Sequence, residues 1–233
     1  MKKEYLLLLL VAVFLAVVVF LSLQQTQQKQ QTPQQQQNLQ VLPSKSQKKE
    51  NEEKTMPATL SANKTLNAPE LSIDQNKNYQ VSLHTTQGDI VIELDVQHTP
   101  IAANNFVYLA EQHFYDQTIF HRVIKGFMIQ GGDPRGDGTG GPGYRFANES
   151  FPGEYVRGAV AMANAGPDTN GSQFFIMQQD YPLPKDYVIF GQVISGMEVV
   201  DQIANAAVTN SFSGELSKPV SPVVVESISV AVN

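Results

Sequence analysis

Apolar and polar residues alternate in short runs from about residue 78 to the end of the chain. The run YQVSL at 79–83 alternates in this way, and so does IVIEL at 90–94, after the turn TQGD. Successive side chains of a strand point to opposite faces, so the two runs predict a hairpin with one buried face. The same pattern predicts further strands at Thr118–Ile124, Phe127–Gln130, Ala159–Ala163, Phe174–Met177, Val188–Val193 and Val223–Val230.

Two other segments have the three-to-four-residue spacing of helices. The first begins at Thr99-Pro100, where threonine can cap the helix and proline suits its first position, and it turns Phe106 and Leu109 inward. The second covers Gly196–Ala206 and has one apolar face. Many short strands with two helices predict a mainly β fold, a closed antiparallel barrel with helices over its ends.

The start of the chain has a different pattern, the apolar run LLLLLVAVFLAVVVFLSL at Leu6–Leu23. Its eighteen residues, at ~1.5 Å each, nearly span a bilayer core of about 30 Å. The run is longer than the apolar part of a signal peptide, and it leads into Gln24-Gln25 without a small-residue cleavage site. It predicts an uncleaved transmembrane anchor at residues 1–23, with a cleaved signal peptide as the alternative.

Lys2 and Lys3 precede this run, so the positive-inside rule places the N-terminus in the cytoplasm and the rest of the chain outside it. Residues 24–77 are rich in glutamine and lysine and have no sustained hydrophobic periodicity, which predicts a disordered tether. The folded domain is then expected at residues 78–233. It would be extracytoplasmic and membrane-anchored, or secreted or periplasmic if the N-terminal segment is cleaved.

Charge and composition exclude several kinds of partner and site. Residues 78–233 hold sixteen acidic and seven basic residues, a net charge of −9, and the whole chain has four arginines. Nucleic-acid binding needs clustered basic residues, so no nucleic-acid partner is expected. The absence of cysteine excludes disulfides, thiolate metal sites and a cysteine nucleophile.

Standard catalytic motifs are also missing. The four histidines form no metal-binding pair, and Ser172 lies in NGSQF and not in G-x-S-x-G. The glycine-rich run at 131–143 has neither the lysine of a P-loop nor a βαβ setting, and we expect it to matter only if it borders a site. No metal ion or cofactor is therefore expected.

The segment FHRVIKGFMIQGGD at Phe120–Asp133 places Arg122 within a run of residues typical of a core. A guanidinium keeps its charge in proteins and is costly to bury without partners. The segment therefore raises the question of what the Arg122 side chain faces.

This segment, together with MANAGPDTNGSQFFI at Met162–Ile176, closely resembles the two signature segments of the cyclophilins, which are peptidyl-prolyl cis-trans isomerases. The resemblance extends over about Tyr79–Val232 and includes GDIVIELD, GTGG and VIFGQVISGMEVVD. Two long motifs in the right order, with supporting segments around them, make it highly specific. The short link from Phe151 to Met162 is similar to that of bacterial members.

The resemblance implies an eight-stranded antiparallel barrel capped by two helices, and isomerase activity on proline-containing peptides and unfolded proteins. It also implies the residues of the site. The catalytic positions fall on Arg122 and Gln130, and the substrate-binding positions fall on Phe127, Met128, Ala163, Asn164, Gln173, Phe175, Leu183 and Tyr187. By alternation, Phe120, Ile129 and Phe174 should point the other way and belong to the scaffold.

Two positions depart from the family pattern. Pro182 stands where cyclosporin-sensitive members carry tryptophan, so weak cyclosporin binding is expected, and Tyr187 stands where many members carry histidine.

We expect a monomeric domain that assists the folding of secreted or envelope proteins. The alternative is a non-catalytic module that docks proline peptides at the membrane, which would not require Arg122. A general chaperone is a third possibility, and it would also act on clients without proline.

Overall fold

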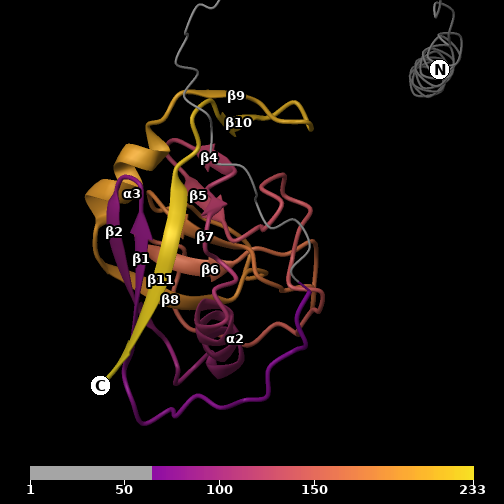
Figure 1. Ribbon diagram of the computed structural model, residues 1–233, viewed down its shortest axis with the longest axis vertical. Helices are drawn as coiled ribbons and strands as arrows, with labels where there is room; N and C mark the ends of the chain where they lie inside the picture. Colours follow the sequence, from indigo (N-terminus) through magenta and orange to yellow (C-terminus); the bar gives the residue numbers. More distant parts are fainter. Residues whose placement is uncertain (1–64) are drawn as a thin grey trace, which may run out of the picture. The chain divides into compact units, whose positions relative to one another are not determined.

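An antiparallel β-sheet forms the framework of residues 65–233, the part of the chain that the computed structural model describes (Figure 1). In chain order its strands are β1 (Tyr79–Thr85), β2 (Gly88–Leu94), β3 (Thr118–Ile119), β4 (Arg122–Ile124), β5 (Met128–Gly131), β6 (Ala159–Met162), β7 (Phe174–Met177), β8 (Ile189–Ser195) and β11 (Val224–Val232). These nine strands lie in the order β3-β11-β1-β2-β8-β6-β7-β5-β4. Two further strands, β9 (Val208–Asn210) and β10 (Leu216–Pro219), pair with each other in a separate hairpin.

The predicted anchor at Leu6–Leu23, and the predicted tether as far as residue 64, lie outside the described residues. Within residues 65–233, no helix combines the length and the apolar character that crossing a membrane requires. The membrane anchor and its orientation therefore stay predictions from the sequence.

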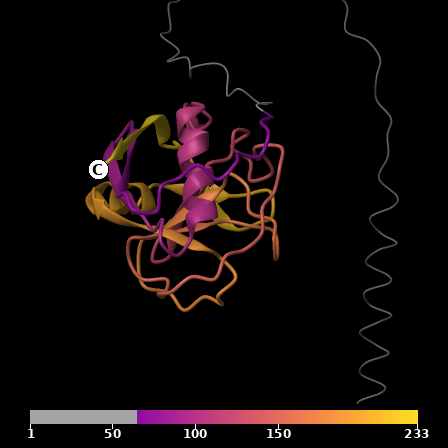
Figure 2. The same cartoon turned by 90° about the horizontal axis from the view of Figure 1, so that it is seen from below.

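The predicted hairpin and both predicted helices are present. β1 and β2 pair as expected, with Val81 opposite Ile92. Helix α2 (Pro100–Glu111) starts at the proline and buries Phe106 and Leu109, while helix α3 (Met197–Ala204) is shorter than predicted at its C-terminal end. Figure 2, which views the domain from the α2 end, shows this helix in front of the sheet.

Aromatic side chains join α2 to the sheet. The ring centroid of Phe106 lies 4.9 Å from that of Tyr115 and 5.2 Å from those of Phe174 on β7 and Phe190 on β8. All four side chains are almost completely buried. Such aromatic pairs stabilise a core by about 0.5–1.5 kcal/mol each beyond the area they bury. The position of β7, which carries residues of the predicted site, is thus fixed from inside the core.

The start of α2 is capped by a residue that the local pattern did not indicate. Thr99 occupies the N-cap position as predicted, but its hydroxyl donates to the carbonyl of Asp95 at 3.0 Å and caps no helical N–H. The carboxylate of Glu149 instead accepts hydrogen bonds from the backbone N–H groups of Ile101 and Ala102, both at 2.8 Å. A negative charge at a helix N-terminus is favourable. The predicted capping by the threonine side chain is therefore wrong. Glu149, which is distant in the sequence, accepts the hydrogen bonds of the first helical N–H groups instead.

The sheet differs from the predicted barrel at Thr118–Ile124, which forms two strands and not one. β3 pairs with β11, whereas β4 pairs with β5 at the other end of the strand order. Between them the N–H of Phe120 donates to Val223 at 3.1 Å and the N–H of His121 donates to Gln130 at 3.0 Å, so the chain changes neighbours there. Among the described strands, β3 and β4 form no ladder with each other. The coarse architecture is as predicted, but a closed eight-stranded barrel is not confirmed.

The hairpin of β9 and β10 was not predicted. Both strands are short, and neither VTN nor LSKP alternates apolar and polar residues in the way that indicates a strand. Figure 1 shows the hairpin beside β4, and β10 makes close contacts with that strand. The hairpin therefore adds residues to the edge of the sheet that carries Arg122.

Residues 65–77, which we call the N-terminal strap, lie against the domain although the sequence places them in a disordered tether. The side-chain oxygen of Asn104 on α2 accepts hydrogen bonds from the N–H groups of Ser72 at 2.9 Å and Ile73 at 3.1 Å. Its amide nitrogen donates to the carbonyl of Glu70 at 3.0 Å. The ordering comes from a buried side chain elsewhere in the fold, so the strap's own sequence gave no sign of it.

Replacing Asn104 should loosen the strap. We expect Asn104→Ala to lower the free energy of unfolding by about 2 kcal/mol, because it leaves three backbone groups of the strap without partners. Urea denaturation followed by circular dichroism measures this change. Asn205→Ala, which removes one exposed hydrogen bond to Asp201, is the matched control and should cost under about 0.5 kcal/mol. Equal effects of the two variants would contradict this role of Asn104.

Candidate active site

Arg122 lies on β4, at one end of the strand order, directly opposite Gln130 on β5. Alternation along these two strands sends Val123 and Ile129 into the main core, where they are at most 1% exposed. The Arg122 side chain keeps 35% of its surface exposed. Its charge is therefore on the side of the sheet away from the main core.

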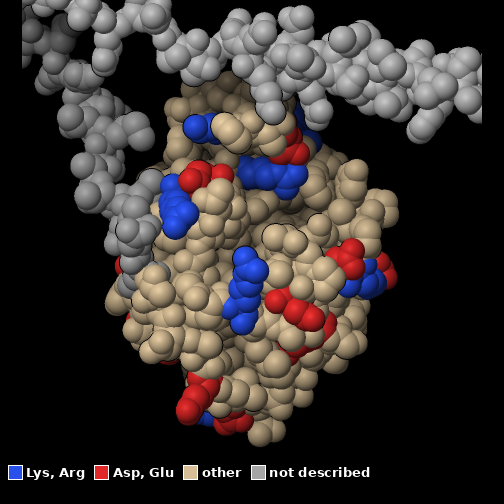
Figure 3. Space-filling model, turned by 90° about the vertical axis from the view of Figure 1, so that its right-hand side faces the viewer, with Lys and Arg blue, Asp and Glu red and all other residues tan. Residues whose placement is uncertain are grey.

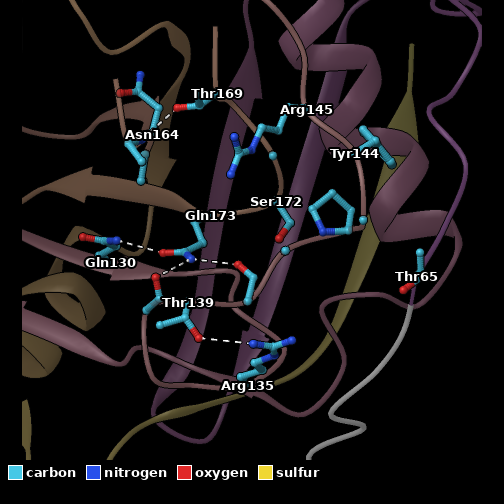
Figure 4. A pocket seen from close by; sticks show the side chains of 18 residues that line it. Thr65, Gln130, Arg135, Thr139, Tyr144, Arg145, Asn164, Thr169, Ser172 and Gln173 are labelled. Carbon is cyan, nitrogen blue, oxygen red and sulfur yellow. Dashed lines mark hydrogen bonds between the residues drawn. The ribbon is translucent and has the colours of Figure 1, made fainter. Parts of the chain in front are cut away.

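A chain of hydrogen bonds leads from Arg122 across the sheet. Nη1 of Arg122 donates to Oε1 of Gln130 at 3.2 Å. Nε2 of Gln130 donates to Oε1 of Gln173 at 3.0 Å, a hydrogen bond that Figure 4 shows. Nε2 of Gln173 in turn donates to the carbonyls of Gly140 at 2.9 Å and Gly138 at 3.1 Å. Each amide acts as both donor and acceptor, so the orientation of both side chains is fixed. The glycine-rich run thus borders the site.

The other side of Arg122 is occupied by Glu215, which directly precedes β10 in the β9–β10 hairpin. Nε donates to Oε2 at 2.7 Å and Nη2 donates to Oε1 at 2.8 Å, a two-point ion pair. These hydrogen bonds from Arg122 lower the pKa of Glu215 to about 2. Sequence reasoning missed this residue, because no motif places the hairpin next to β4.

The apolar residues predicted for the substrate pocket pack together, apart from the main core. We call this group the second apolar cluster. Its buried members are Met128, Tyr155, Ala159, Ala161, Phe175 and Met177, and Ile124, Phe127, Phe151, Ala163, Leu183, Tyr187 and Ile189 pack against them. Phe120, Ile129 and Phe174 belong to the main core, as alternation predicted. Nη1 of Arg122 lies 3.9 Å from the Met128 sulfur, so the guanidinium borders this cluster.

Tyr155 orders one wall of the second apolar cluster. Its hydroxyl donates to the carbonyl of Tyr187 at 2.9 Å and accepts from the N–H of the same residue at 3.1 Å. The ring of Tyr187 then stands edge-on to that of Phe175, with centroids 5.6 Å apart. Sequence reasoning missed Tyr155, which lies in an irregular link with no periodic pattern. Its contribution is to hold Tyr187 in place by two hydrogen bonds.

Another wall consists of Phe127 and the segment that follows β7. The ring of Tyr181 packs against that of Phe127 at a tilt of 45°, with centroids 4.6 Å apart, and 47% of Tyr181 is exposed. Leu183, two residues further on, packs against the second apolar cluster. Pro182 stands between them, where the sequence lacks the tryptophan expected for cyclosporin binding.

A cavity of about 720 Å³ adjoins the second apolar cluster. Its lining includes four predicted site residues, Gln130, Ala163, Asn164 and Gln173, together with much of the glycine-rich run. Figure 4 shows two arginines, Arg135 and Arg145, and Thr65 of the N-terminal strap around the same space. The predicted residues therefore fall into two adjoining parts, a polar cavity and an apolar cluster, and Ala163 belongs to both.

Asn164 lines the cavity. Its side-chain nitrogen donates to the carbonyl of Asp186 at 2.8 Å, and its side-chain oxygen accepts from the N–H of Gly166 at 3.2 Å. Within residues 65–233, neither its own backbone N–H nor its own carbonyl has a hydrogen-bond partner. These groups are available to an extended peptide.

The charges on this side of the domain are mixed in sign. Figure 3 shows basic and acidic side chains next to each other around a hollowed surface.

Burial lowers the pKa of His121, next to Arg122, and both of its ring nitrogens lack partners among the described residues. Within residues 65–233, no three histidine, aspartate or glutamate side chains lie close enough together to hold a metal ion.

Comparison with known proteins agrees with this geometry. Residues 80–230 match the family model of cyclophilin type peptidyl-prolyl cis-trans isomerases. The chain is 43% identical over 178 residues to a probable peptidyl-prolyl cis-trans isomerase A of Mycobacterium leprae, a match that covers 66% of this chain and 93% of that protein. It is 42% identical over 160 residues to peptidyl-prolyl cis-trans isomerase-like 3 of Dictyostelium discoideum, covering 66% and 96%.

Solved structures show the same similarity. A cyclophilin type peptidyl-prolyl cis-trans isomerase of Cryptosporidium parvum has a TM-score of 0.60 and 39% identity to this chain, over 67% of this chain and 99% of that one. A crystal structure of the same protein in the presence of the dipeptide Ala-Pro has a TM-score of 0.59 and 40% identity, over 66% and 99%. The family resemblance predicted from the sequence is confirmed.

The ion pair at Arg122 should make stability depend on pH in the acid range. The pKa of Glu215 is lowered in the folded state, so its contribution is present above its unfolded value near 4.5 and is lost as the pH falls toward about 2. We expect Glu215→Gln to lower the unfolding free energy at pH 7 by no more than about 1 kcal/mol, since both side chains are over a third exposed.

Urea titrations between pH 7 and pH 3 measure this effect, and the gap between wild type and Glu215→Gln should shrink as the pH falls. Glu226→Gln is the control, because Glu226 is exposed on β11 and forms no ion pair within the described residues. A gap that stays constant over the whole range would show that the ion pair adds no stability.

Proposed function

We propose a mechanism and a cellular setting for this chain, which belongs to the cyclophilin-type peptidyl-prolyl cis-trans isomerases and is therefore an enzyme that accelerates rotation about X-Pro bonds. The barrier to that rotation is about 20 kcal/mol, because amide resonance must be broken. Uncatalysed isomerisation consequently takes tens of seconds or longer. The protein must stabilise the twisted peptide bond more than the planar one.

Arg122 is the residue to which we assign this stabilisation. Twisting the bond localises a lone pair on the prolyl nitrogen, and a donor aimed at that nitrogen acts only in the twisted state. Arginine is always charged and has several donors in a rigid fork. The observation that carries the proposal is the 3.9 Å contact between Nη1 and the Met128 sulfur, which puts the charge at the border of the second apolar cluster.

The other site residues bind the substrate. Phe127, Met128, Phe175 and Leu183 form the floor and walls for a proline ring, and Tyr187 completes the wall beside Phe175. Ala163 and the backbone of Asn164 receive the peptide main chain along the cavity. Gln130 holds the guanidinium, and Gln173 holds Gln130. This scheme requires no nucleophile, general base or metal ion, because no covalent bond is made or broken.

The setting follows from the N-terminal sequence. We propose that Leu6–Leu23 anchors the chain in a membrane with the isomerase domain outside the cytoplasm, where it acts on proline-containing segments of secreted or envelope proteins. We also propose that the domain acts as a monomer. Unfolded chains are natural substrates, since the cis form is far more populated at X-Pro bonds in unfolded peptides than in folded proteins.

Removing the guanidinium should abolish most of the activity without unfolding the protein. We expect Arg122→Ala to reduce kcat/KM about 100-fold in a protease-coupled assay with a proline tetrapeptide, the size of effect seen when one transition-state donor is lost. Arg157→Ala is the control, because Arg157 pairs with Asp201 on α3 and lies outside the site. If Arg122→Ala retains wild-type activity, the assigned role of Arg122 is wrong. A wild-type chain that binds the peptide without accelerating its isomerisation would instead be a docking module.

The proposed anchor predicts how the full-length chain fractionates. After alkaline extraction, the full-length chain should remain in the membrane pellet, while a chain lacking Leu6–Leu23 should move to the supernatant. Mass spectrometry of the recovered protein shows whether the N-terminal segment is retained. A full-length chain found in the supernatant with a shortened N-terminus would favour the cleaved signal peptide.

A further inference from the structure

The β9–β10 hairpin holds Glu215 in a defined place beside Arg122. Its tip is a tight turn in which the N–H of Ser211 donates to the carbonyl of Glu215 at 2.7 Å and the N–H of Gly214 donates to the carbonyl of Ser211 at 3.0 Å. Gly214 has a φ of 85°, a backbone conformation that favours glycine. The backbone of Glu215 is thus tied into the turn, and its carboxylate reaches the guanidinium of Arg122 at two points.

The N–H groups of the Arg122 guanidinium differ in whether they have a hydrogen-bond acceptor. A guanidinium has five N–H groups. Glu215 accepts one from Nε and one from Nη2, and Gln130 accepts one from Nη1. The second N–H of Nη2 has no partner among residues 65–233, and the remaining N–H of Nη1 has only the weak sulfur acceptor of Met128. The N–H groups without a strong acceptor therefore sit on the two terminal nitrogens, and one of these nitrogens, Nη1, borders the second apolar cluster.

We propose that Glu215 is a positioning residue for the isomerase reaction, which fixes the plane of the Arg122 guanidinium so that its terminal N–H groups meet the prolyl nitrogen. This inference rests on the role proposed above for Arg122. An arginine side chain has many rotamers, and a donor that is already ordered loses no freedom when the bond twists. Gln130 holds the guanidinium from β5 and Glu215 holds it from the hairpin, so two separate parts of the fold define one orientation.

The carboxylate also has an opposing effect, because a negative charge beside the guanidinium weakens its attraction for the prolyl lone pair. The Glu215 side chain is 39% exposed and that of Arg122 is 35% exposed, so water screens this charge. The hydrogen bonds at 2.7 and 2.8 Å are short and directional, and solvent does not replace their effect on orientation. Ordering is therefore the larger effect, and Glu215 raises the activity.

The test uses the full-length chain and the protease-coupled assay with a proline tetrapeptide. We expect Glu215→Ala to reduce kcat about tenfold while KM is unchanged, because the peptide-binding residues remain and only the donor is misplaced. Glu215→Gln keeps one acceptor and should lose less activity than Glu215→Ala. Ser213→Ala, at the tip of the same hairpin and without contact to Arg122, is the control and should have wild-type activity.

A double-mutant cycle with Arg122→Ala separates positioning from a general structural effect. If Glu215 acts through the guanidinium, adding Glu215→Ala to Arg122→Ala should change kcat by less than about twofold. A tenfold loss in that background as well, or unchanged or increased activity of Glu215→Ala alone, would overturn the inference. If Arg122→Ala itself has wild-type activity, the proposed mechanism fails. If Arg122→Ala is impaired and Glu215→Ala is not, only the role of Glu215 fails.

Discussion

The charge of Arg122 is the constraint around which this domain is arranged. No protein environment removes that charge, and burying it without partners is unfavourable, so the surrounding chain must supply acceptors. They come from three places that are remote from one another in the sequence: Gln130 on β5, Glu215 on the β9–β10 hairpin and, through Gln130, Gln173 before β7. The edge of the sheet where β4 lies is where these three segments meet. These three segments are fixed by the sheet or by the hairpin. The guanidinium is therefore held by rigid parts of the fold.

The sheet also separates the residues that stabilise the fold from those assigned to chemistry. β4, β5 and β7 alternate between a face that packs in the main core and a face that carries the second apolar cluster, as Phe174 and Phe175 illustrate. Phe174 contacts Phe106 in the main core, whereas its neighbour Phe175 contacts Tyr187. Substitutions on the second face can therefore alter substrate binding with little effect on the main core, because the two faces have different packing partners.

The sequence was sufficient for features that depend on local patterns or long motifs. Alternation located the β1–β2 hairpin, the three-to-four-residue spacing located the inward positions of α2, and the two signature segments led to the family and to Arg122. It was insufficient wherever a partner lies far along the chain. Glu149 caps α2, Asn104 orders the strap, and Glu215 pairs with Arg122, each through a single side chain whose partner is remote in the sequence. The split between β3 and β4 has the same origin, since each half takes its partner from a different end of the strand order.

The N-terminal strap affects how the pocket should be studied in isolation. The N–H of Leu66 donates to the carbonyl of Pro142 at 2.8 Å, and the Thr65 side chain lies against Gly143, so the strap forms part of the cavity wall. A recombinant domain begun at residue 78, where the β-sheet pattern starts, would have a wider and differently shaped cavity from that of the intact chain. Inhibitors or peptide libraries selected against such a fragment would be fitted to a surface that the strap covers in the natural protein. The useful boundary for ligand discovery therefore lies before Thr65, well upstream of the first strand.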